Sequence, residues 1–469
     1  MLNWLKLYHH LPYPLRVLVA SARGYYLRWW RYGPETERLI EEALERETWS
    51  PQQWRAWQEE RLAYVLHRAR HKVPYYREYW DKRRRAGDRT SWEVLENWPI
   101  LKKEEVRKNP QAFVAEDCDI RKMYHEHTSG TTGTPLSLWV SRRVLREWYA
   151  LFEARIRRWH GVSFKERWGI FGGKPVVPFE RRKPPFWVRN YGLNQVYFSV
   201  LHIAPWSAKH YIEAIQKFGL THLIVYTSSL YALACEVPEE NLPISSSLRV
   251  IFTNAEPLFE FQRKKIEKVF GCPVRETYGQ AEMVCAASEC EHGRLHLWPE
   301  VGVVEVIDEH GTKVSPGRIG RLIATGLLNT DMPLIRYEIG DLVEWIDEIS
   351  SPCQCGRNLP LLGKILGRND DVILTEDGRK IVQIDTIFDP EFPIKEAQII
   401  QESLCRFTIR VVPVEGWNKH YADRLAQALQ DRVGKVEVII KEVDRIERTW
   451  AGKFRIIVSH LADTLDEDV

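Results

Sequence analysis

Short apolar runs alternate with helical segments between residues 168 and 270, and this alternation limits the possible folds more than any other feature of the chain. Runs typical of buried strands occur at 168–171, 222–226 and 249–253, and helical patterns occur at 207–218, from Ser229 onward, and at 258–270. Strands that alternate with helices usually pair in parallel, because each helix carries the chain back across the sheet. The segment therefore predicts an α/β layer with a largely parallel sheet.

The segments before and after 168–270 have different sequence patterns. Residues 34–85 follow a helical pattern that breaks near Pro74, and 141–160 are predicted to form one long helix capped by Ser141. From 295 to 345 the chain becomes rich in strand patterns separated by turns.

A boundary is predicted at 367–371, and beyond it a compact α+β unit has strands at 407–412 and 436–440 and a helix at 421–433. We therefore expect a large N-terminal α/β region, residues 1–368, with a β-rich subdomain. A small mobile α+β domain should follow at 369–469, which is a usual domain size.

The bulk properties exclude several classes of protein. A chain of 469 residues is too long for one ordinary core. A net charge of +3 is close to balanced and does not indicate the strongly basic surface of a nucleic-acid-binding protein. No apolar run approaches the roughly 18 residues that span a bilayer, and prolines and Arg16 interrupt the only N-terminal candidate for a signal peptide. The expected compartment is the cytoplasm, with reduced cysteines.

The first 34 residues carry five basic side chains and no acidic one, interleaved with tryptophans and tyrosines. Such a basic aromatic arm could rest on an anionic membrane surface. The alternative is a helical arm that packs its aromatic side chains against the body of the protein.

A stretch of hydroxyl-bearing residues and glycines follows His127. It reads Thr128, Ser129, Gly130, Thr131, Thr132, Gly133, Thr134, Pro135. Its backbone N–H groups and hydroxyls suit a triphosphate, and a flexible linker is the alternative. The chain has neither a Walker A motif nor a GxGxxG that opens a helix, so a nucleotide site must rest on other motifs.

Five further motifs follow in order, and together they carry a resemblance. They are Asn254-Ala255-Glu256-Pro257, Tyr278-Gly279-Gln280-Ala281-Glu282, Tyr337-Glu338-Ile339-Gly340-Asp341, Gly367-Arg368-Asn369-Asp370-Asp371 and Ala451-Gly452-Lys453. The set resembles that of the adenylate-forming superfamily of acyl-CoA synthetases, adenylation domains and luciferases. Within it, Val73–Arg77 and Cys353–Arg357 make the chain most similar to the phenylacetate–CoA ligase branch. The similarity is greatest to that branch's CapK-like members, which are associated with capsular polysaccharide synthesis.

The resemblance implies a reaction and a set of roles. A small carboxylic acid would attack ATP to give an acyl-adenylate, and a thiol, that of coenzyme A, would then accept the acyl group. The roles are phosphate binding by Thr128–Gly133, adenine contact by Ala255, Glu256 and Tyr278, ribose contact by Asp341 and Arg368, Mg²⁺ binding by Glu282, catalysis by Lys453 and hinge motion at Asp370. Amine or hydroxyl acceptors remain open, as does a non-catalytic nucleotide- or acyl-binding subunit of a polysaccharide pathway.

The chain departs from the family pattern beside Pro135, where Thr134 and Leu136 stand in place of a common lysine or arginine. We therefore expect His127 or Arg121 to supply positive charge, or ATP binding to be weak.

Cysteines and histidines cluster in the β-rich section and just after it. Among Cys285, Cys290, His292, His296, Cys353 and Cys355, we predict that Cys290, His296, Cys353 and Cys355 hold a structural Zn²⁺ that joins two β-rich segments. Unliganded reduced thiols are the alternative.

Overall fold

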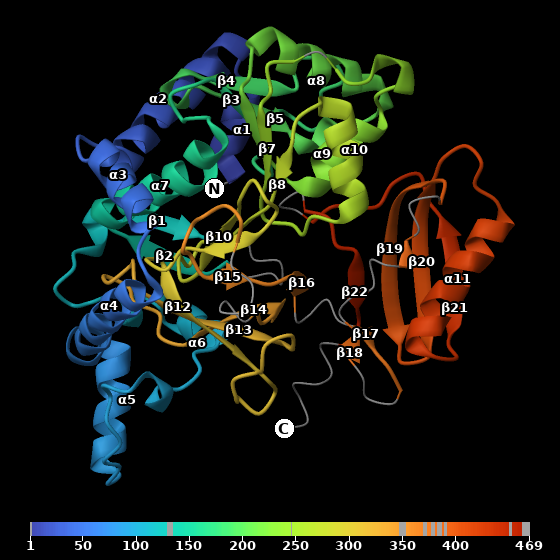
Figure 1. Cartoon of the computed structure of the whole chain (residues 1–469). Helices are drawn as coiled ribbons and strands as arrows, with labels where there is room; N and C mark the ends of the chain where they lie inside the picture. The colour runs from blue at the N-terminus through green and yellow to red at the C-terminus, as the bar shows by residue number, and fades with distance from the viewer. Residues whose placement is uncertain are drawn as a thin grey trace.

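A six-stranded sheet is the framework of the larger part of the molecule (Figure 1). The computed structural model describes residues 2–128, 135–244, 246–346, 353–368, 373–376, 380–381, 387–388, 392–449 and 453–461. The sheet has the order β4-β5-β3-β6-β7-β8, and only the edge strand β4 is antiparallel to its neighbour. Its strands are β3 (Trp168–Gly172), β4 (Trp187–Asn190), β5 (Gln195–Ser199), β6 (His222–Val225), β7 (Val250–Thr253) and β8 (Val274–Arg275).

Helices cover both faces of this sheet, so β6 and β7 are buried at every position. One core cluster joins the sheet to α8 (Pro205–Phe218), α9 (Thr227–Cys235) and α10 (Glu260–Phe270). Another cluster joins the opposite face to α3 (Thr36–Arg46) and α7 (Arg142–Phe152). The predicted α/β layer with a largely parallel sheet is confirmed.

The β-rich section forms two antiparallel four-stranded sheets. The first has the order β15-β11-β10-β9 and the second β12-β13-β14-β16. Their strands are β9 (Thr277–Gly279), β10 (Ala286–Glu289), β11 (Leu295–Leu297), β12 (Gly302–Ile307), β13 (Ile319–Gly326), β14 (Tyr337–Glu344), β15 (Leu361–Leu362) and β16 (Ile365–Arg368). The section thus begins before the predicted residue 295 and continues past residue 345.

The helices before the sheet follow the expected pattern. α4 (Pro51–Lys72) starts with a capping box on Ser50, and α5 (Pro74–Arg85) begins one residue after Val73, because Pro74 fits the first turn of a helix. The predicted break is therefore a single residue. The short helix α6 (Lys103–Lys108) follows.

Ser141 caps α7 as predicted, since its hydroxyl accepts a hydrogen bond from the backbone N–H of Val144. The helix does not stay α-helical to residue 160. It continues as the π-helix η4 (Glu153–Arg157) and a turn of 3₁₀-helix, η5 (Arg158–His160).

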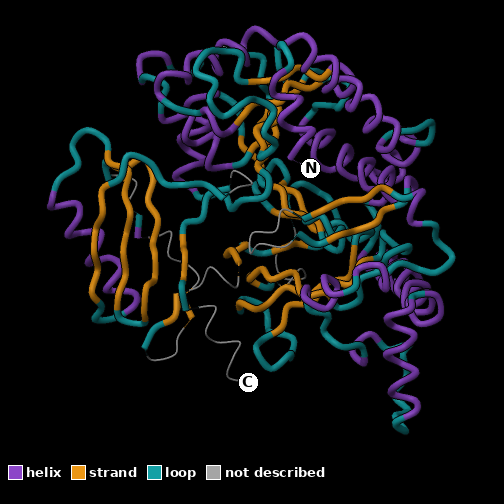
Figure 2. Tube along the Cα trace, turned by 180° about the vertical axis from the view of Figure 1, so that it is seen from behind, coloured by secondary structure: helices purple, strands orange, loops and turns teal. Residues whose placement is uncertain are grey.

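The C-terminal part lies beside the rest of the chain and consists of its own sheet with a helix packed on it (Figures 1 and 2). Its sheet has the order β21-β20-β19-β22 and is covered by α11. The elements are β17 (Ile373–Leu374), β18 (Lys380–Ile381), β19 (Ile394–Ser403), β20 (Arg406–Pro413), α11 (Lys419–Val433), β21 (Glu437–Glu442) and β22 (Ile457–Ser459). The small α+β unit expected after residue 368 is present.

Two helices form the N-terminal arm, α1 (Leu2–His10) and α2 (Tyr13–Arg31). Trp30 packs in the core against Tyr124, but four other aromatic side chains of the arm are exposed: Trp4, Tyr25, Tyr26 and Trp29. The expectation that the arm packs its aromatic residues on the body therefore holds only in part. In the part of the chain that the structure describes, no helix is long and apolar enough to cross a membrane.

A buried ion pair joins the helical layer to the β-rich section. Both terminal nitrogens of Arg155, in η4, donate to the carboxylate of Glu300 at 2.6 and 2.7 Å, and the two side chains are 0% and 4% exposed. Burial by itself would raise the pKa of Glu300, but Arg155 and Arg46 hold it below its ordinary value. Glu47 lies 3.6 Å from Arg155 and Arg46 lies 3.1 Å from Glu300, so the pair is the centre of a larger network of charges.

Substituting Glu300→Ala should therefore lower the free energy of unfolding by about 3–5 kcal/mol, because Arg155 would stay buried and lose both of its short hydrogen bonds to a carboxylate, with Glu47 at 3.6 Å as the remaining counter-charge. Urea unfolding followed by tryptophan fluorescence measures the change. Glu37→Ala is the matched control: its partner Lys165 is 57% exposed, so the loss should be only about 0–1 kcal/mol. Equal losses for the two variants would contradict the argument.

Candidate functional site

A cleft of about 530 Å³ gathers residues from segments that are far apart in the sequence. Side chains after β7, around β9, on β14 and on the segment 449–455 all line it. The lining includes these residues of the predicted motifs: Thr128, Asn254, Ala255, Glu256, Pro257, Tyr278, Gly279, Gln280, Ala281, Glu282, Ile339, Asp341, Gly367 and Lys453. The residues predicted to bind the nucleotide or to act in catalysis, where the structure describes their side chains, thus border one space.

The base of the hydroxyl-rich loop is closed at Thr128. β1 (Tyr124–His127) and β2 (Ser137–Val140) form an antiparallel pair, and Thr128 sits where they join the loop. The Thr128 N–H donates to the Leu136 carbonyl at 3.1 Å, and its hydroxyl accepts from the Leu136 N–H at 2.9 Å. Residues 129–134, which include the predicted phosphate-binding Ser129, Gly130, Thr131, Thr132 and Gly133, lie outside the described residues.

The turn after β7 presents two of the predicted nucleotide contacts. Ala255 has φ +65°, a left-handed conformation that costs a non-glycine residue about 1–2 kcal/mol. This conformation turns the chain at the edge of the cleft.

Glu256 follows, and its carboxylate accepts hydrogen bonds from two directions. The Ser228 N–H and hydroxyl donate at 2.8 and 3.0 Å, and the Phe454 N–H donates at 2.9 Å. Burial raises the pKa of Glu256 despite these donors. The carboxylate therefore ties the segment around Lys453 to the end of the central sheet.

Lys453 lines the cleft from a closed turn. Its carbonyl accepts from the Thr449 N–H at 2.8 Å, and its own N–H donates to the Thr449 hydroxyl at 3.1 Å. Asp370, the predicted hinge residue, lies outside the described residues.

Tyr278 and Asp341 meet across the cleft wall. The Tyr278 hydroxyl donates to one carboxylate oxygen of Asp341 at 2.6 Å. Asp341 pairs in register with Arg368 on the neighbouring strand β16, although the side chain of Arg368 is not described.

Glu282 is buried among partners that sequence reasoning did not identify. Its carboxylate accepts from the Tyr337 hydroxyl at 2.8 Å and from the Lys103 ammonium at 3.2 Å. Lys103 is the first residue of α6 and also lines the cleft. The local sequence, Lys102-Lys103-Glu104-Glu105, has the pattern of an ordinary charged surface helix and gives no signal for this role.

Of the two residues expected to supply the positive charge that the loop lacks, one lies away from the cleft. Arg121 does not line the cleft: it is 86% exposed and bonded to Asp119. His127 does line the cleft, with its ring beside that of His125. The cation next to the predicted Mg²⁺ ligand is thus Lys103, from an earlier segment.

The four cysteine and histidine residues predicted to hold zinc lie together. Their ligand atoms are all within 4.8 Å of one another, with Cys290 Sγ and Cys353 Sγ 3.6 Å apart and Cys355 Sγ 3.4 Å from His296 Nε2. The other ring nitrogen of His296 bonds to the Leu359 carbonyl at 3.2 Å, which orients Nε2 toward the thiols. Cys285 is instead a fully buried core residue.

Glu276 is a carboxyl group that the sequence did not single out. It lines the cleft, and burial together with the neighbouring Glu289 raises its pKa to about 7. A proton therefore stays on this group at pH values where an ordinary glutamate is charged.

Two family models match the chain. Residues 54–330, more than half of the chain, match the family described as AMP-binding enzyme, and residues 373–460 match the CapK C-terminal domain. The chain is 27% identical over 467 residues to Protein CapK of Staphylococcus aureus, which covers 98% of this chain and 100% of that protein. It is 28% identical to phenylacetate-coenzyme A ligase of Thermus thermophilus over 359 residues, which covers 73% and 74% of the two chains.

Solved structures share the fold. The crystal structure of 2-hydroxyisobutyryl-CoA ligase in the postadenylation state, in complex with R3-HIB-AMP, superposes with a TM-score of 0.69. The superposition covers 90% of this chain and 93% of that one, at 21% sequence identity.

The raised pKa of Glu276 predicts a pH-dependent gain in stability for Glu276→Gln. The folded state binds a proton up to about pH 7 and the unfolded state only up to about 4.5, so the stabilisation by this group is full below pH 4.5 and is lost as the pH rises through 7. Glutamine cannot ionise. The variant should therefore be more stable than the parent by about 1–3 kcal/mol near pH 8 and differ little near pH 5.

Urea unfolding at the two pH values provides the measurement. Glu240→Gln, on an exposed turn, is the control and should behave like the parent at both. A Glu276→Gln variant whose stability relative to the parent does not change with pH would show that the carboxyl ionises normally.

Proposed function

This chain belongs to the AMP-binding enzyme family, and on that basis we propose that it is an ATP-dependent acid–thiol ligase that works in the cleft around Glu282 and Lys453. A carboxylate oxygen of a small acid attacks the α-phosphorus of ATP, and pyrophosphate leaves. The thiol of coenzyme A then attacks the acyl carbon, the bond to the phosphate oxygen breaks, the thiol loses its proton and AMP leaves.

The observation that carries the proposal is that residues from six separate motif segments border one cleft. Two anions must meet in the first step, so the protein has to position them and neutralise charge. Lys453 is assigned to the charge that develops between the carboxylate and the α-phosphate. Tyr278 and Ala255 are assigned to the adenine, Asp341 and Arg368 to the ribose, and the loop from Thr128 to Gly133 to the phosphates.

The residues present fit a hard cation beside the phosphates. Glu282 offers a buried carboxylate, the ligand type that Mg²⁺ prefers. Bound Mg²⁺ supplies charge neutralisation on the phosphates. Lys103, bonded to the same carboxylate at 3.2 Å, places a second positive charge at this wall of the cleft.

The acid is proposed to be apolar and bulky, with one polar group. The cleft is lined on one side by aromatic and aliphatic side chains, Trp148, Tyr149, Phe152, Ile156 and Trp298. The amide of Gln280 also lines it, and its nitrogen and oxygen are buried with no hydrogen-bond partner among the described residues. A polar substituent of the substrate would satisfy that amide.

The setting of the reaction is part of the same proposal. The division at residue 368, with a hinge at Asp370, lets the C-terminal domain carry Lys453 into and out of the cleft. The compartment is the cytoplasm, where ATP and coenzyme A are available. The match to CapK over the length of both chains supports a place in polysaccharide synthesis.

The cysteine and histidine cluster is proposed to bind one structural Zn²⁺. Tetrahedral coordination with Zn–S distances of about 2.3 Å puts two thiolates ~3.8 Å apart, close to the 3.6 Å between Cys290 and Cys353. The metal would tie the β10–β11 hairpin to the segment before β15, with no open position for catalysis.

Lys453→Ala should reduce carboxylate-dependent ATP–pyrophosphate exchange by ~10²–10³ while ATP binding is retained, because the lysine acts on charge that develops in the transition state. Lys441→Ala, on exposed β21 of the same domain, is the control and should exchange normally.

The exchange assay also separates the alternatives. Wild-type protein that binds ATP but gives no exchange with any acid in a broad aromatic and aliphatic panel would be a non-catalytic binding subunit. Exchange without transfer to coenzyme A would point to an amine or hydroxyl acceptor.

Protein purified without chelator should contain stoichiometric zinc by elemental analysis, and Cys355→Ser should lose it, because the serine hydroxyl is a poor replacement for a thiolate. Cys405→Ser, an exposed cysteine outside the cluster, should keep the metal. A wild-type protein that is folded and free of metal would remove the zinc assignment.

A further inference from the structure

Helix α2 packs against the body with one face, whose buried residues are Arg16, Ser21, Gly24, Leu27 and Trp30. The Ser21 hydroxyl accepts a hydrogen bond from the Tyr191 N–H at 3.1 Å. A Cβ added at Gly24 would lie 1.8 Å from the side-chain oxygen of Asn190, so the helix lies in direct contact with the chain at the end of β4. The inner face is thus closely packed, and Leu27 and Trp30 are its two buried large apolar side chains.

Six other large apolar side chains of α2 point away from the body. Leu15, Leu18, Val19, Tyr25, Tyr26 and Trp29 are spaced three or four residues apart, or a multiple of that, and form one stripe along the helix, which we call the outer stripe. All six are exposed, with Leu18 at 64% and Trp29 at 50%. Trp4 and Leu7 of α1, at 77% and 56%, extend the apolar surface. A surface helix usually turns its large apolar side chains inward, whereas α2 leaves these six in contact with solvent.

The charges around the outer stripe have one sign. Lys6, Arg23 and Arg28 are exposed, and residues 1–34 contain no aspartate or glutamate. The guanidinium of Arg28 has no hydrogen-bond or ion-pair partner among the described residues. A partner that is complementary to this face must have a negatively charged surface and an apolar interior into which the side chains can insert. An anionic bilayer has both.

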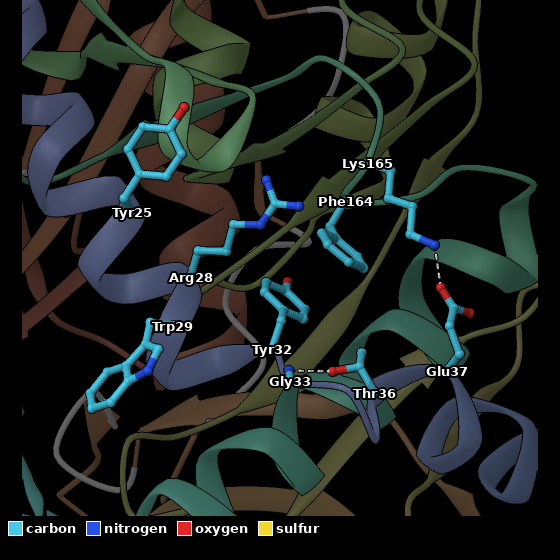
Figure 3. A pocket seen from close by; sticks show the side chains of 9 residues that line it. All are labelled: Tyr25, Arg28, Trp29, Tyr32, Gly33, Thr36, Glu37, Phe164 and Lys165. Atoms are coloured by element: carbon cyan, nitrogen blue, oxygen red, sulfur yellow. Dashed lines mark hydrogen bonds and ion pairs between the residues drawn. The ribbon is translucent and has the colours of Figure 1, made fainter.

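A recess of about 470 Å³ opens at the C-terminal end of the stripe (Figure 3). The stacked rings of Tyr32 and Phe164, 3.9 Å apart, form one wall, and the side chain of Arg28 extends toward them. Lys165 also lines the recess, where it pairs with Glu37. A lipid phosphate group would fit between an unpaired guanidinium and these rings.

We propose that α1 and α2 form a docking face that lies flat on an anionic lipid bilayer. The outer stripe enters the boundary between head groups and acyl chains, the basic side chains contact lipid phosphates, and the recess around Arg28 receives one head group. The aromatic side chains match the interfacial region of a bilayer, where amphipathic rings are favoured. This proposal rests on the arm alone and is independent of the chemistry assigned to the cleft.

Vesicle co-sedimentation of the full chain tests the proposal. The protein should bind vesicles of phosphatidylcholine mixed with phosphatidylglycerol at least about tenfold better than vesicles of phosphatidylcholine alone, and added salt should weaken that binding. The double variant Leu18→Glu with Val19→Glu should lose binding to the anionic vesicles. Arg28→Gln should lose most of the preference for the anionic lipid.

The matched control is Ile319→Glu with Val414→Glu, which places the same charges at apolar positions that are 46% and 47% exposed elsewhere. That variant should bind vesicles like the parent, and both double variants should keep the parent's urea midpoint. Equal binding to the two kinds of vesicle, or unchanged binding by the Leu18 and Val19 variant, would overturn the proposal. A third outcome is that the wild-type protein does not bind vesicles but is a dimer, and that Leu18→Glu with Val19→Glu makes it monomeric. The face would then be an interface between copies, and the lipid assignment would be wrong.

Discussion

The cleft depends on a carboxylate that accepts hydrogen bonds from two separate parts of the chain. Glu256 receives the Ser228 donors from the larger part of the molecule and the Phe454 N–H from the C-terminal part. Lys395 also pairs with Glu236 across the same boundary. These contacts hold the segment around Lys453 against the end of β7 and close the cleft on that side.

The acids assigned to the nucleotide are already engaged before any ligand is present. Asp341 accepts from Tyr278, and Glu282 accepts from Tyr337 and Lys103. A carboxylate taken out of water without a partner is costly, so these bonds hold both groups in place. Ligand binding therefore exchanges one set of partners for another, and the desolvation of the two acids has already occurred during folding.

Sequence reasoning succeeded where the information is local. The strand–helix alternation predicted β3, β6, β7 and the helices between them, and the cap at Ser141 has the expected geometry. It missed β4 and β5; β4 follows a segment rich in prolines and basic residues, whereas Val196, Tyr197 and Phe198 of β5 do form a strand-like run. Lys103 could not be found, since its contact with Glu282 joins residues 179 positions apart and only the tertiary path of α6 creates it. The thiol and imidazole cluster was predicted from ligand type and from the family pattern, and its four residues do lie together; of the two cations named for the loop, His127 lines the cleft and the exposed Arg121 does not.

The sheet β15-β11-β10-β9 connects that cluster to the nucleotide side of the cleft. Ala287 on β10 pairs with Tyr278 on one side and with Leu297 on the other, and His296 on β11 pairs with Leu361 on β15. Hydrogen-bonded strands shift together more readily than they slide past one another. The four-ligand cluster and Tyr278 are therefore parts of one hydrogen-bonded sheet, and the strand pairings β15–β11, β11–β10 and β10–β9 join the segment at 353–355 to the wall of the cleft.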